Sequence, residues 1–214
     1  MKEKTRVLLA DDHKIVLEGL KSLLESEFWL VGSVENGRDL LTEVHRLRPD
    51  VIVVDISMPL LNGIEAVREI RKTDPDIKII FLTMHPDVTY ATRAFEAGAS
   101  GYILKHSAST ELVKAIHEAV KGRTYITPMI AGQLIQTYKA GKHAEESLEA
   151  KLTPRQTQVL QLLAEGYSAK RTAAIMNISP RTVEFHKYRI MEELNIKSNA
   201  ELIQVAIKHG IVTS

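Results

Sequence analysis

The chain has 214 residues, 44% of them hydrophobic and none of them cysteine, so it is long enough for one large or two modest packed domains but excludes disulfides and thiolate metal sites. Residues 151–214 carry nine Lys and Arg against five Asp and Glu, whereas residues 1–150 carry nineteen against twenty-two, which favours an anionic partner for the C-terminal part. The first apolar run is too short for a signal peptide, and no stretch approaches the roughly 18–20 apolar residues of a membrane helix, so we expect a soluble, cytoplasmic protein without a membrane partner.

The first 127 residues alternate between short apolar runs and helical patterns. The runs are continuous rather than alternating, as expected of parallel strands covered on both faces. They lie at residues 7–10, 30–34, 51–54, 79–82 and 102–104. Between them, apolar residues recur at helical spacing, for example Val16, Leu20, Leu23 and Leu24. Five β–α repeats predict an α/β fold with an open, doubly wound parallel sheet.

The rest of the chain has a different pattern. Residues 128–150 begin as a helix-prone connector and end in a polar stretch, and we expect a flexible linker around residues 141–150. From residue 151 onward, capping signals predict four helices and no strands. The predicted starts are Thr153, Ser168, Ser179 and Ser198, and the predicted stops are Gly166, Asn177 and Gly210. The second and third helices form a candidate helix-turn-helix. We therefore divide the chain into 1–127, 128–150 and 151–214.

Charged side chains follow three of the five apolar runs. Asp11 and Asp12 follow the first run, Asp55 follows the third and Lys105 follows the fifth. Because the carboxyl ends of parallel strands form the edge where ligands bind in open sheets, we expect these groups to lie close together. A carboxylate at the end of a buried strand is costly unless something compensates it. This edge is therefore a candidate functional site.

These residues predict a metal-assisted phosphate site. Three neighbouring carboxylates raise one another's pKa unless a cation is present, and hard oxygen ligands favour Mg²⁺ over Zn²⁺. Lys105 would neutralise phosphoryl oxygens around Asp55, and Thr83, after the fourth run, would donate a hydrogen bond to one of them. Asp55 would be the nucleophile, because carboxylates form aspartyl-phosphates. The eight histidines are scattered, and none supports a metal assignment.

The pattern Asp11-Asp12, Asp55-Ile56-Ser57-Met58-Pro59, Gly63, Thr83 and Lys105 resembles the flavodoxin-like (βα)5 receiver domain of two-component response regulators, over about residues 4–122. The resemblance implies that Asp55 accepts a phosphoryl group from a phosphohistidine on a sensor histidine kinase. It further implies that Asp12, Asp55 and the Ser57 carbonyl bind Mg²⁺ directly, while Asp11 acts through water. In the same family, Thr83 and Lys105 would sense the phosphate, and Tyr102 would be the switch residue. Ser57 and His85 stand where the lifetime of the phosphoryl group is tuned.

Other interpretations of these residues remain. Asp11 and Asp12 alone would cap the next helix, Lys105 alone would be a surface lysine, and Tyr102 alone would be strand packing. An aspartyl-phosphate hydrolase would use the same site, but it needs a water-activating base and a substrate pocket that the sequence does not show. A transcription factor with a vestigial receiver is a further alternative, against which the complete acidic set argues. We expect no enzyme activity beyond self-phosphorylation and self-dephosphorylation.

The third predicted C-terminal helix, 180–194, has one apolar face with Val183, Ile190 and Leu194. Its opposite face is suited to the major groove of DNA. The candidate DNA contacts, with two from the preceding helix, are Lys170, Arg171, Arg181, Thr182, Glu184, Phe185, Lys187, Tyr188 and Arg189. The arginines and Lys170 would contact phosphates, whereas Phe185 would meet a thymine methyl and Glu184 a cytosine amine. Lys187 lies beside the apolar face and would have to extend outward.

Residues 150–212 resemble the LuxR-type helix-turn-helix of the NarL/FixJ regulators, although Gln156-Thr157 stands where the family usually has Glu-Arg. The resemblance implies regulation of transcription by binding to double-stranded DNA. A homodimer formed on activation would read half-sites about one DNA turn apart. The helix at 199–209 is the candidate dimer contact in this part, through Leu202, Val205, Ala206 and Ile211. A helical interaction domain with solvated charges is the alternative.

Overall fold

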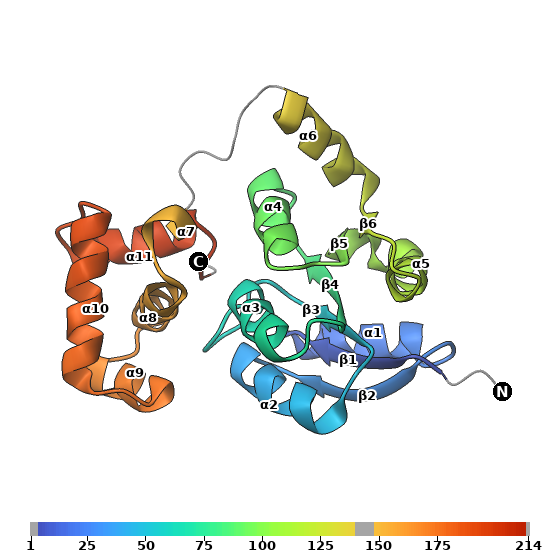
Figure 1. Ribbon diagram of the computed structural model, residues 1–214, viewed down its shortest axis with the longest axis horizontal. Coiled ribbons are helices and arrows are strands. Elements are labelled where there is room, and N and C mark those ends of the chain that lie inside the picture. The colour runs from blue at the N-terminus through green and yellow to red at the C-terminus, as the bar shows by residue number, and fades with distance from the viewer. Residues whose placement is uncertain (1–3, 140–147, 213–214) are drawn as a thin grey trace.

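The computed structural model describes residues 4–139 and 148–212. A parallel α/β part is followed by a helical part (Figure 1). The strands are β1 (Arg6–Ala10), β2 (Trp29–Val34), β3 (Val51–Val54), β4 (Lys78–Thr83), β5 (Gly101–Leu104) and β6 (Tyr125–Ile126), in the sheet order β2-β1-β3-β4-β5-β6. The helices of this part are α1 (Lys14–Leu24), α2 (Gly37–Leu47), α3 (Gly63–Thr73), α4 (Val88–Glu96), the 3₁₀ turn η1 (Lys105–Ser107), α5 (Ala108–Val120) and α6 (Pro128–Lys139).

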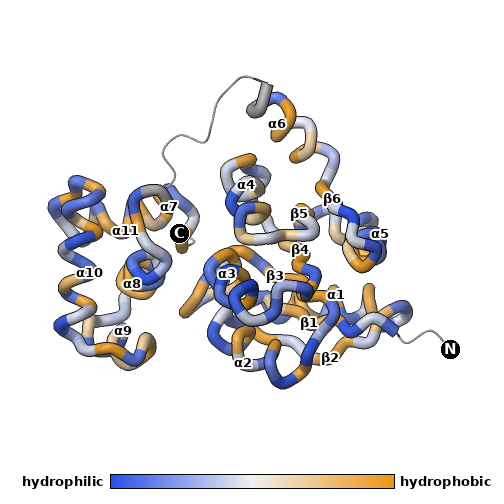
Figure 2. Tube along the Cα trace, in the orientation of Figure 1, coloured by the Kyte–Doolittle hydropathy of each residue, from blue (hydrophilic) through white to orange (hydrophobic). Residues whose placement is uncertain are grey.

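The central strands β1, β3, β4 and β5 are buried on both faces, which explains their continuous apolar sequences, whereas the edge strand β2 is partly exposed. Leu8, Ile52 and Ile79 point into one hydrophobic core with α2, α3 and α4. Their neighbours along the strands, such as Val53 and Ile80, point into a second core with α1 and α5. Figure 2 shows the hydrophobic colour concentrated along β1, β3 and β4. The predicted α/β class and doubly wound sheet are confirmed.

Two details of this part differ from the prediction. A sixth strand, β6, pairs with β5, although its two residues are too few to form a recognisable apolar run. In α1, the buried residues are Leu17, Leu20 and Leu24, whereas Val16 is only partly buried. The buried face of α1 is therefore turned from Val16 toward Leu17, because helical spacing alone fits either of these two neighbouring residues.

The helical part consists of α7 (Leu148–Lys151), α8 (Pro154–Ala164), α9 (Ala169–Met176), α10 (Pro180–Glu193) and α11 (Asn199–Lys208). Of the linker predicted around 141–150, residues 141–147 lie outside the described residues and 148–150 belong to α7. Thr153 and Gln156 form the predicted capping box. Ser168, Ser179 and Ser198 each accept a hydrogen bond from the backbone of the helix that they precede. Such caps satisfy amide groups that the helix itself leaves free, so the polar signals marked the helix starts correctly.

Within residues 4–139 and 148–212, none of the helices has the length and apolar character that crossing a membrane requires.

Candidate functional site

The acidic edge is built where the strand order reverses. After β1 the chain crosses to β2 on one side and then to β3 on the other, so that β1 lies between them. Ala10 and Val54 are paired in register, and the Asp55 amide donates to the Ala10 carbonyl at 2.8 Å. Asp11 and Asp55 therefore leave adjacent strand ends, as expected for a ligand site at a topological switch point. Both are almost fully buried, with 1% and 4% exposure.

Lys105 connects the two buried carboxylates. It begins the 3₁₀ turn η1 after β5, and its Nζ lies 2.7 Å from Asp11 Oδ2 and 2.8 Å from Asp55 Oδ2. Its side chain is only 9% exposed. A buried ion pair of this kind is stable only when the opposite charges are well placed, because both groups lose their hydration. The structure therefore brings the strand-end carboxylates of Asp11 and Asp55 together with the ammonium of Lys105, as the sequence predicted.

The site contains more negative charge than Lys105 compensates. Burial, with a smaller contribution from nearby Asp11, raises the pKa of Asp55 to about 6, although Lys105 and the Ser57 backbone act in the opposite direction. Burial by itself would lower the pKa of Lys105, but Asp55 and Asp11 hold that pKa above its ordinary value. A further cation would therefore be bound favourably here.

The donor atoms at this edge fit a hard divalent metal. Asp11, Asp12, His13 and Asp55 each offer an atom within 4.8 Å of the others. Asp12 Oδ1 is buried without a hydrogen-bond partner, and His13 Nδ1 approaches it to 2.8 Å. Carboxylate oxygens are the ligands that Mg²⁺ prefers. His13, which directly follows Asp12, lies in this cluster, so the sequence interpretation in which no histidine supports a metal assignment omitted a donor that the structure places there.

Thr83 and Tyr102 lie beside this edge, and His85 connects them. Thr83 ends β4, is fully buried, and its Oγ1 accepts a hydrogen bond from the His85 amide at 3.2 Å. Tyr102 is also fully buried, and its hydroxyl donates to the His85 carbonyl at 2.8 Å. Burial raises the pKa of this phenol, so it stays a donor. The ring is directed toward the loop after β4 rather than toward solvent.

The side chain of His85 joins the loop after Asp55 to α4. Its Nε2 lies 2.9 Å from Ser57 Oγ, and its ring is stacked on Tyr90 with the centroids 4.4 Å apart. Burial lowers the pKa of His85, which favours the neutral imidazole. Sequence position suggested that Ser57 and His85 matter to the site, but nothing in the sequence indicated this hydrogen bond or the contact with Tyr90.

The helix-turn-helix consists of α9 and α10. Val183 and Ile190 on α10 are buried, and Leu194 just after it is partly buried, so the core face was predicted correctly. On the opposite face, Phe185 and Tyr188 are 60% and 68% exposed, so both rings are available to a partner.

The other candidate DNA contacts fall into two groups. The side chains exposed to solvent are Lys170, Arg171, Arg181 and Arg189. The partly buried side chains are Thr182, Glu184 and Lys187. Thr182 Oγ1 lies 2.8 Å from the hydroxyl of the capping residue Ser179, and Arg189 forms an ion pair with Glu192 at 2.8 Å. Thr182 therefore also helps to start the helix.

The predicted dimer contact on the last helix was wrong for three of its four residues, while the fourth, Val205, is partly buried. Leu202, Ala206 and Ile211 are at most 2% exposed and form part of the domain's own core. The exposed apolar residues of α11 are Ile203 and Ile207, at 38% and 39%. They lie four residues apart on one side of the helix.

Comparisons with known proteins agree with this geometry. Residues 7–117 match the family model of the response regulator receiver domain, and residues 150–206 match that of the bacterial regulatory proteins of the luxR family. The transcriptional regulatory protein DegU of Brevibacillus brevis is 34% identical, covering 98% of this chain and 95% of that protein. The response regulator UvrY of Escherichia coli K12 is 35% identical, covering 96% and 94%. The structure of RcsB from Salmonella enterica serovar Typhimurium, bound to promoter P1flhDC in the presence of phosphomimetic BeF3-, superposes with a TM-score of 0.63 at 28% identity, covering 94% of this chain and 98% of that one.

The fold and the acidic edge thus define a receiver joined to a helix-turn-helix. The chain belongs to the response regulators of the NarL/FixJ family, with a LuxR-type DNA-binding domain. It is a regulator of transcription, and its relatives are DNA-binding proteins rather than enzymes.

Proposed function

We propose that Asp55 is the phosphoacceptor of this regulator and that its donor is a phosphohistidine on a sensor histidine kinase. The observation that carries the proposal is the buried arrangement of Asp11, Asp55 and Lys105, with contacts of 2.7 and 2.8 Å to the ammonium. An oxygen of the Asp55 carboxylate forms the new bond to phosphorus while the bond from phosphorus to the histidine nitrogen breaks, and the imidazole leaves with that electron pair. Lys105 offsets the charge that accumulates on the phosphoryl oxygens.

We propose Mg²⁺ as the cation of this site, with Asp12, Asp55 and the Ser57 carbonyl as direct ligands and Asp11 acting through water. Bound there, the ion would neutralise the negative charge of the acidic residues and of the phosphoryl group. The unsatisfied Asp12 Oδ1 and the raised pKa of Asp55 support this choice. Thr83 is proposed to donate its hydroxyl hydrogen to a phosphoryl oxygen, because the hydrogen bond that its oxygen accepts from the His85 amide leaves that hydrogen free. Tyr102 is the proposed switch residue that reports phosphorylation to α4.

The proposed output is dimerisation followed by binding of two helix-turn-helix units to double-stranded DNA in the cytoplasm. The exposed rings of Phe185 and Tyr188 and the exposed basic residues of α9 and α10 support a DNA-reading role for α10. We propose that the receiver spans residues 1–127, the linker 128–150 and the DNA-binding domain 151–214. Self-phosphorylation from small donors and self-dephosphorylation would be the only reactions of the chain.

A small phosphodonor with Mg²⁺ tests the phosphoacceptor assignment. The wild type should gain hydroxylamine-labile phosphate, and Asp55→Asn should gain none, because an amide does not form an acyl phosphate. The exposed Asp76→Asn is the matched control and should label like the wild type. Labelling of Asp55→Asn equal to the wild type, or no labelling of the wild type, would remove the assignment. Sustained release of phosphate from many equivalents of donor would favour the hydrolase alternative.

DNA binding is tested through its dependence on salt. Lys170→Ala and Arg181→Ala should each weaken binding to genomic fragments and reduce the slope of log K against log salt by about one, as expected when one phosphate contact is lost. The exposed Lys121→Ala on the receiver side should change neither quantity. Binding that is untouched by both tail substitutions would contradict the proposed surface.

A further inference from the structure

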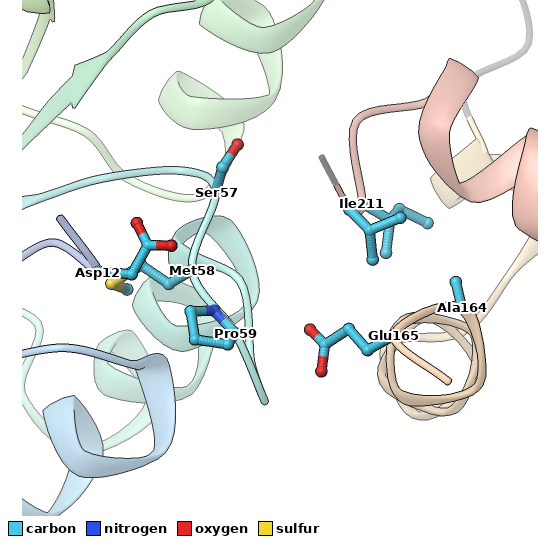
Figure 3. A pocket seen from close by; sticks show the side chains of 8 residues that line it. Asp12, Ser57, Met58, Pro59, Ala164, Glu165 and Ile211 are labelled. Atoms are coloured by element: carbon cyan, nitrogen blue, oxygen red, sulfur yellow. The ribbon is translucent and has the colours of Figure 1, made fainter. Parts of the chain in front are cut away.

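The two sides of the acidic edge are held by different parts of the chain. On the side of β3, the loop after Ser57 reaches the helical domain, where Leu60 packs against the core and Gln161 donates to the loop backbone at 2.9 Å. A cavity of about 150 Å³ lies between the two domains, and Figure 3 shows the Glu165 carboxylate directed from α8 toward this loop. Lys105 does not line this cavity. The ammonium that compensates the buried carboxylates is therefore positioned by other contacts, on the side of β5.

Lys105 directly follows the end of β5, so the direction of its side chain depends on the backbone at Leu104. Its ammonium lies 2.7 and 2.8 Å from the two buried carboxylates. On one side, Leu104 is paired in register with Thr83 of β4. On the other side, the short strand β6 pairs with β5 only as far as Tyr102 and Ile126. The backbone that carries Lys105 therefore has no strand partner on the side of β6.

The hydroxyl of Thr127 replaces this missing strand partner. Thr127 follows β6, and its amide donates to the Tyr102 carbonyl at 3.0 Å, as a parallel ladder requires. In a regular ladder the Leu104 amide would next donate to the Thr127 carbonyl. That carbonyl instead accepts from Ile130 and Ala131 at 2.9 and 3.1 Å, because α6 starts directly after β6 (Figure 1). The Leu104 amide donates to Thr127 Oγ1 at 3.3 Å, so one residue ends the strand, starts the helix and holds the backbone before Lys105.

Glu111 fixes the direction of this hydrogen bond. Thr127 is buried, and its Oγ1 donates to Glu111 Oε2, in the first turn of α5, at 2.8 Å. An ionised carboxylate only accepts and a backbone amide only donates, so the single hydroxyl hydrogen goes to Glu111 and a lone pair remains for the Leu104 amide. Hydrogen bonds to a charged acceptor are also stronger than those between neutral groups. A chain of hydrogen bonds thus runs in one fixed sense from α5 to the backbone beside Lys105.

The position of the Lys105 backbone matters because the side chain itself is flexible. A lysine ammonium is a point charge on a four-carbon stem, so its location is defined only when its backbone is fixed. A buried ion pair is favourable only when the opposite charges are well placed. Leu104 is fully buried, so without the Thr127 hydroxyl its amide would be left unpaired, or the backbone would have to shift toward another acceptor. Either change moves the ammonium relative to the carboxylates.

We propose that Thr127, oriented by Glu111, is a positioning residue that keeps the Lys105 ammonium in place for phosphoryl transfer. Its hydroxyl acts through the Leu104 amide rather than on the reacting atoms. The inference rests on the proposed function for the reaction that Lys105 assists, whereas the placement of Lys105 is measured without phosphorylation. The hydroxyl, and not the methyl group or the bulk of Thr127, carries the role.

Three variants separate the hydroxyl from the rest of the side chain. Thr127→Val keeps the shape and removes the hydroxyl, Thr127→Ser keeps the hydroxyl, and Glu111→Leu leaves the hydroxyl without its acceptor. Thr73→Val is the matched control for the first variant, because it deletes a receiver hydroxyl at the end of α3 that is remote from the acidic edge. Glu118→Leu is the control for the third, because it deletes an ion-paired carboxylate elsewhere on α5.

The placement of Lys105 is measured by NMR of the lysine ammonium groups, on the full chain without metal or phosphodonor. Because two carboxylates hold the Lys105 ammonium and its side chain is only 9% exposed, it should give a resonance protected from exchange with water. Its absence in Lys105→Arg assigns it. The resonance should remain in Thr127→Ser and in both controls, weaken in Glu111→Leu and broaden or vanish in Thr127→Val.

Labelling with acetyl phosphate and Mg²⁺ measures the consequence for the reaction. The rate at which Asp55 gains phosphate should fall about tenfold in Thr127→Val and stay within about twofold of the wild type in Thr127→Ser and the controls, because a misplaced ammonium stabilises the transition state less. The affinity for Mg²⁺, measured by titration calorimetry, should not weaken in Thr127→Val, since the proposed ligands follow β1 and β3 rather than β5.

An unchanged Lys105 resonance in Thr127→Val would overturn the proposal, and so would a changed resonance without slower labelling. Equal losses in Thr127→Ser would show that the methyl group matters instead, and weaker Mg²⁺ binding would show that the whole edge is disturbed; both results contradict the proposal. If circular dichroism shows that Thr127→Val does not fold, Glu111→Leu against Glu118→Leu decides by the same signals. Failure of the phosphoacceptor assignment would appear as a wild type that gains no phosphate, while the Lys105 resonance still tests the placement.

Discussion

Replacing the proposed phosphoacceptor should stabilise the metal-free protein. In the absence of metal, burial and the neighbouring Asp11 raise the pKa of Asp55 from 3.8 to about 6, against the effect of Lys105. Each pKa unit corresponds to about 1.4 kcal/mol, so the charged carboxylate costs the fold about 3 kcal/mol near neutral pH. In Asp55→Asn this cost is absent, while the amide oxygen still accepts from Lys105 and Lys105 keeps its contact with Asp11.

The sign of the pH dependence follows from the raised pKa. The cost is complete above a pH of about 6, decreases as the pH falls through that value and is absent below 3.8, where the carboxyl is protonated in both the folded and the unfolded chain. The gain of Asp55→Asn should therefore be about 3 kcal/mol near pH 7.5 and about half of that near pH 5. For a domain of this size, the larger value raises the Tm by on the order of 10 °C.

Calorimetry in a chelating buffer measures this difference. The receiver transition is followed for the wild type, Asp55→Asn and the exposed control Asp76→Asn, which should leave the Tm unchanged. Addition of Mg²⁺ should raise the Tm of the wild type more than that of Asp55→Asn, because only the wild type keeps all the carboxylates that the cation neutralises. An equal or lower Tm for Asp55→Asn near neutral pH, or a gain that does not change with pH, would refute the reasoning.

Three further predictions follow from single contacts. Gly63→Ala would place a Cβ 2.0 Å from the Asp55 carbonyl oxygen and should destabilise the receiver by several kcal/mol in urea unfolding. Gly19→Ala, in open space within α1, is the control and should stabilise the receiver by about 0.5–1 kcal/mol. Similar effects of the two substitutions would contradict the packing of the loop after Asp55. Tyr102→Phe leaves the His85 carbonyl without its 2.8 Å donor and should cost about 1 kcal/mol in the same assay, and no loss would mean that water replaces the hydroxyl. Burial raises the pKa of Glu165, so its charged form costs stability that decreases as the pH falls, and the gain in Tm of Glu165→Gln should be smaller near pH 4 than near neutral pH, whereas an equal gain at both would contradict the burial of this carboxylate.

Much of the fold could be predicted because local patterns determine it. The continuous apolar runs marked five strands, since a parallel strand covered on both faces needs apolar residues at every position. Serine and threonine caps marked the helix starts, because the hydrogen bonds that they accept are local. By contrast, β6 was missed since two residues form no pattern, and its strand character comes from pairing with β5.

The acidic edge could be predicted from connectivity alone. Parallel strands bring their carboxyl ends to one edge, so Asp11, Asp55 and Lys105 had to lie near each other once the sheet was assigned. The hydrogen bonds of His85 could not be predicted, because they depend on the conformation of the loop after β4. The contacts of Leu60 and Gln161 between the domains were equally inaccessible, since Leu60 looks like any loop leucine and Gln161 like any helical glutamine until the two domains are placed together.

Gly210 shows how closely the two domains are packed. Its backbone lies against Tyr90 so closely that one added methyl group would overlap the ring, although the residue belongs to neither the acidic edge nor α10. Its φ of +60° also disfavours any residue with a Cβ. A change from glycine to alanine, which needs a single base substitution, would therefore strain the turn after α11 and displace the Tyr90 ring that is stacked on His85. One substitution in the helical domain can thus reach the loop beside the acidic edge without altering either the residues of that edge or the face of α10.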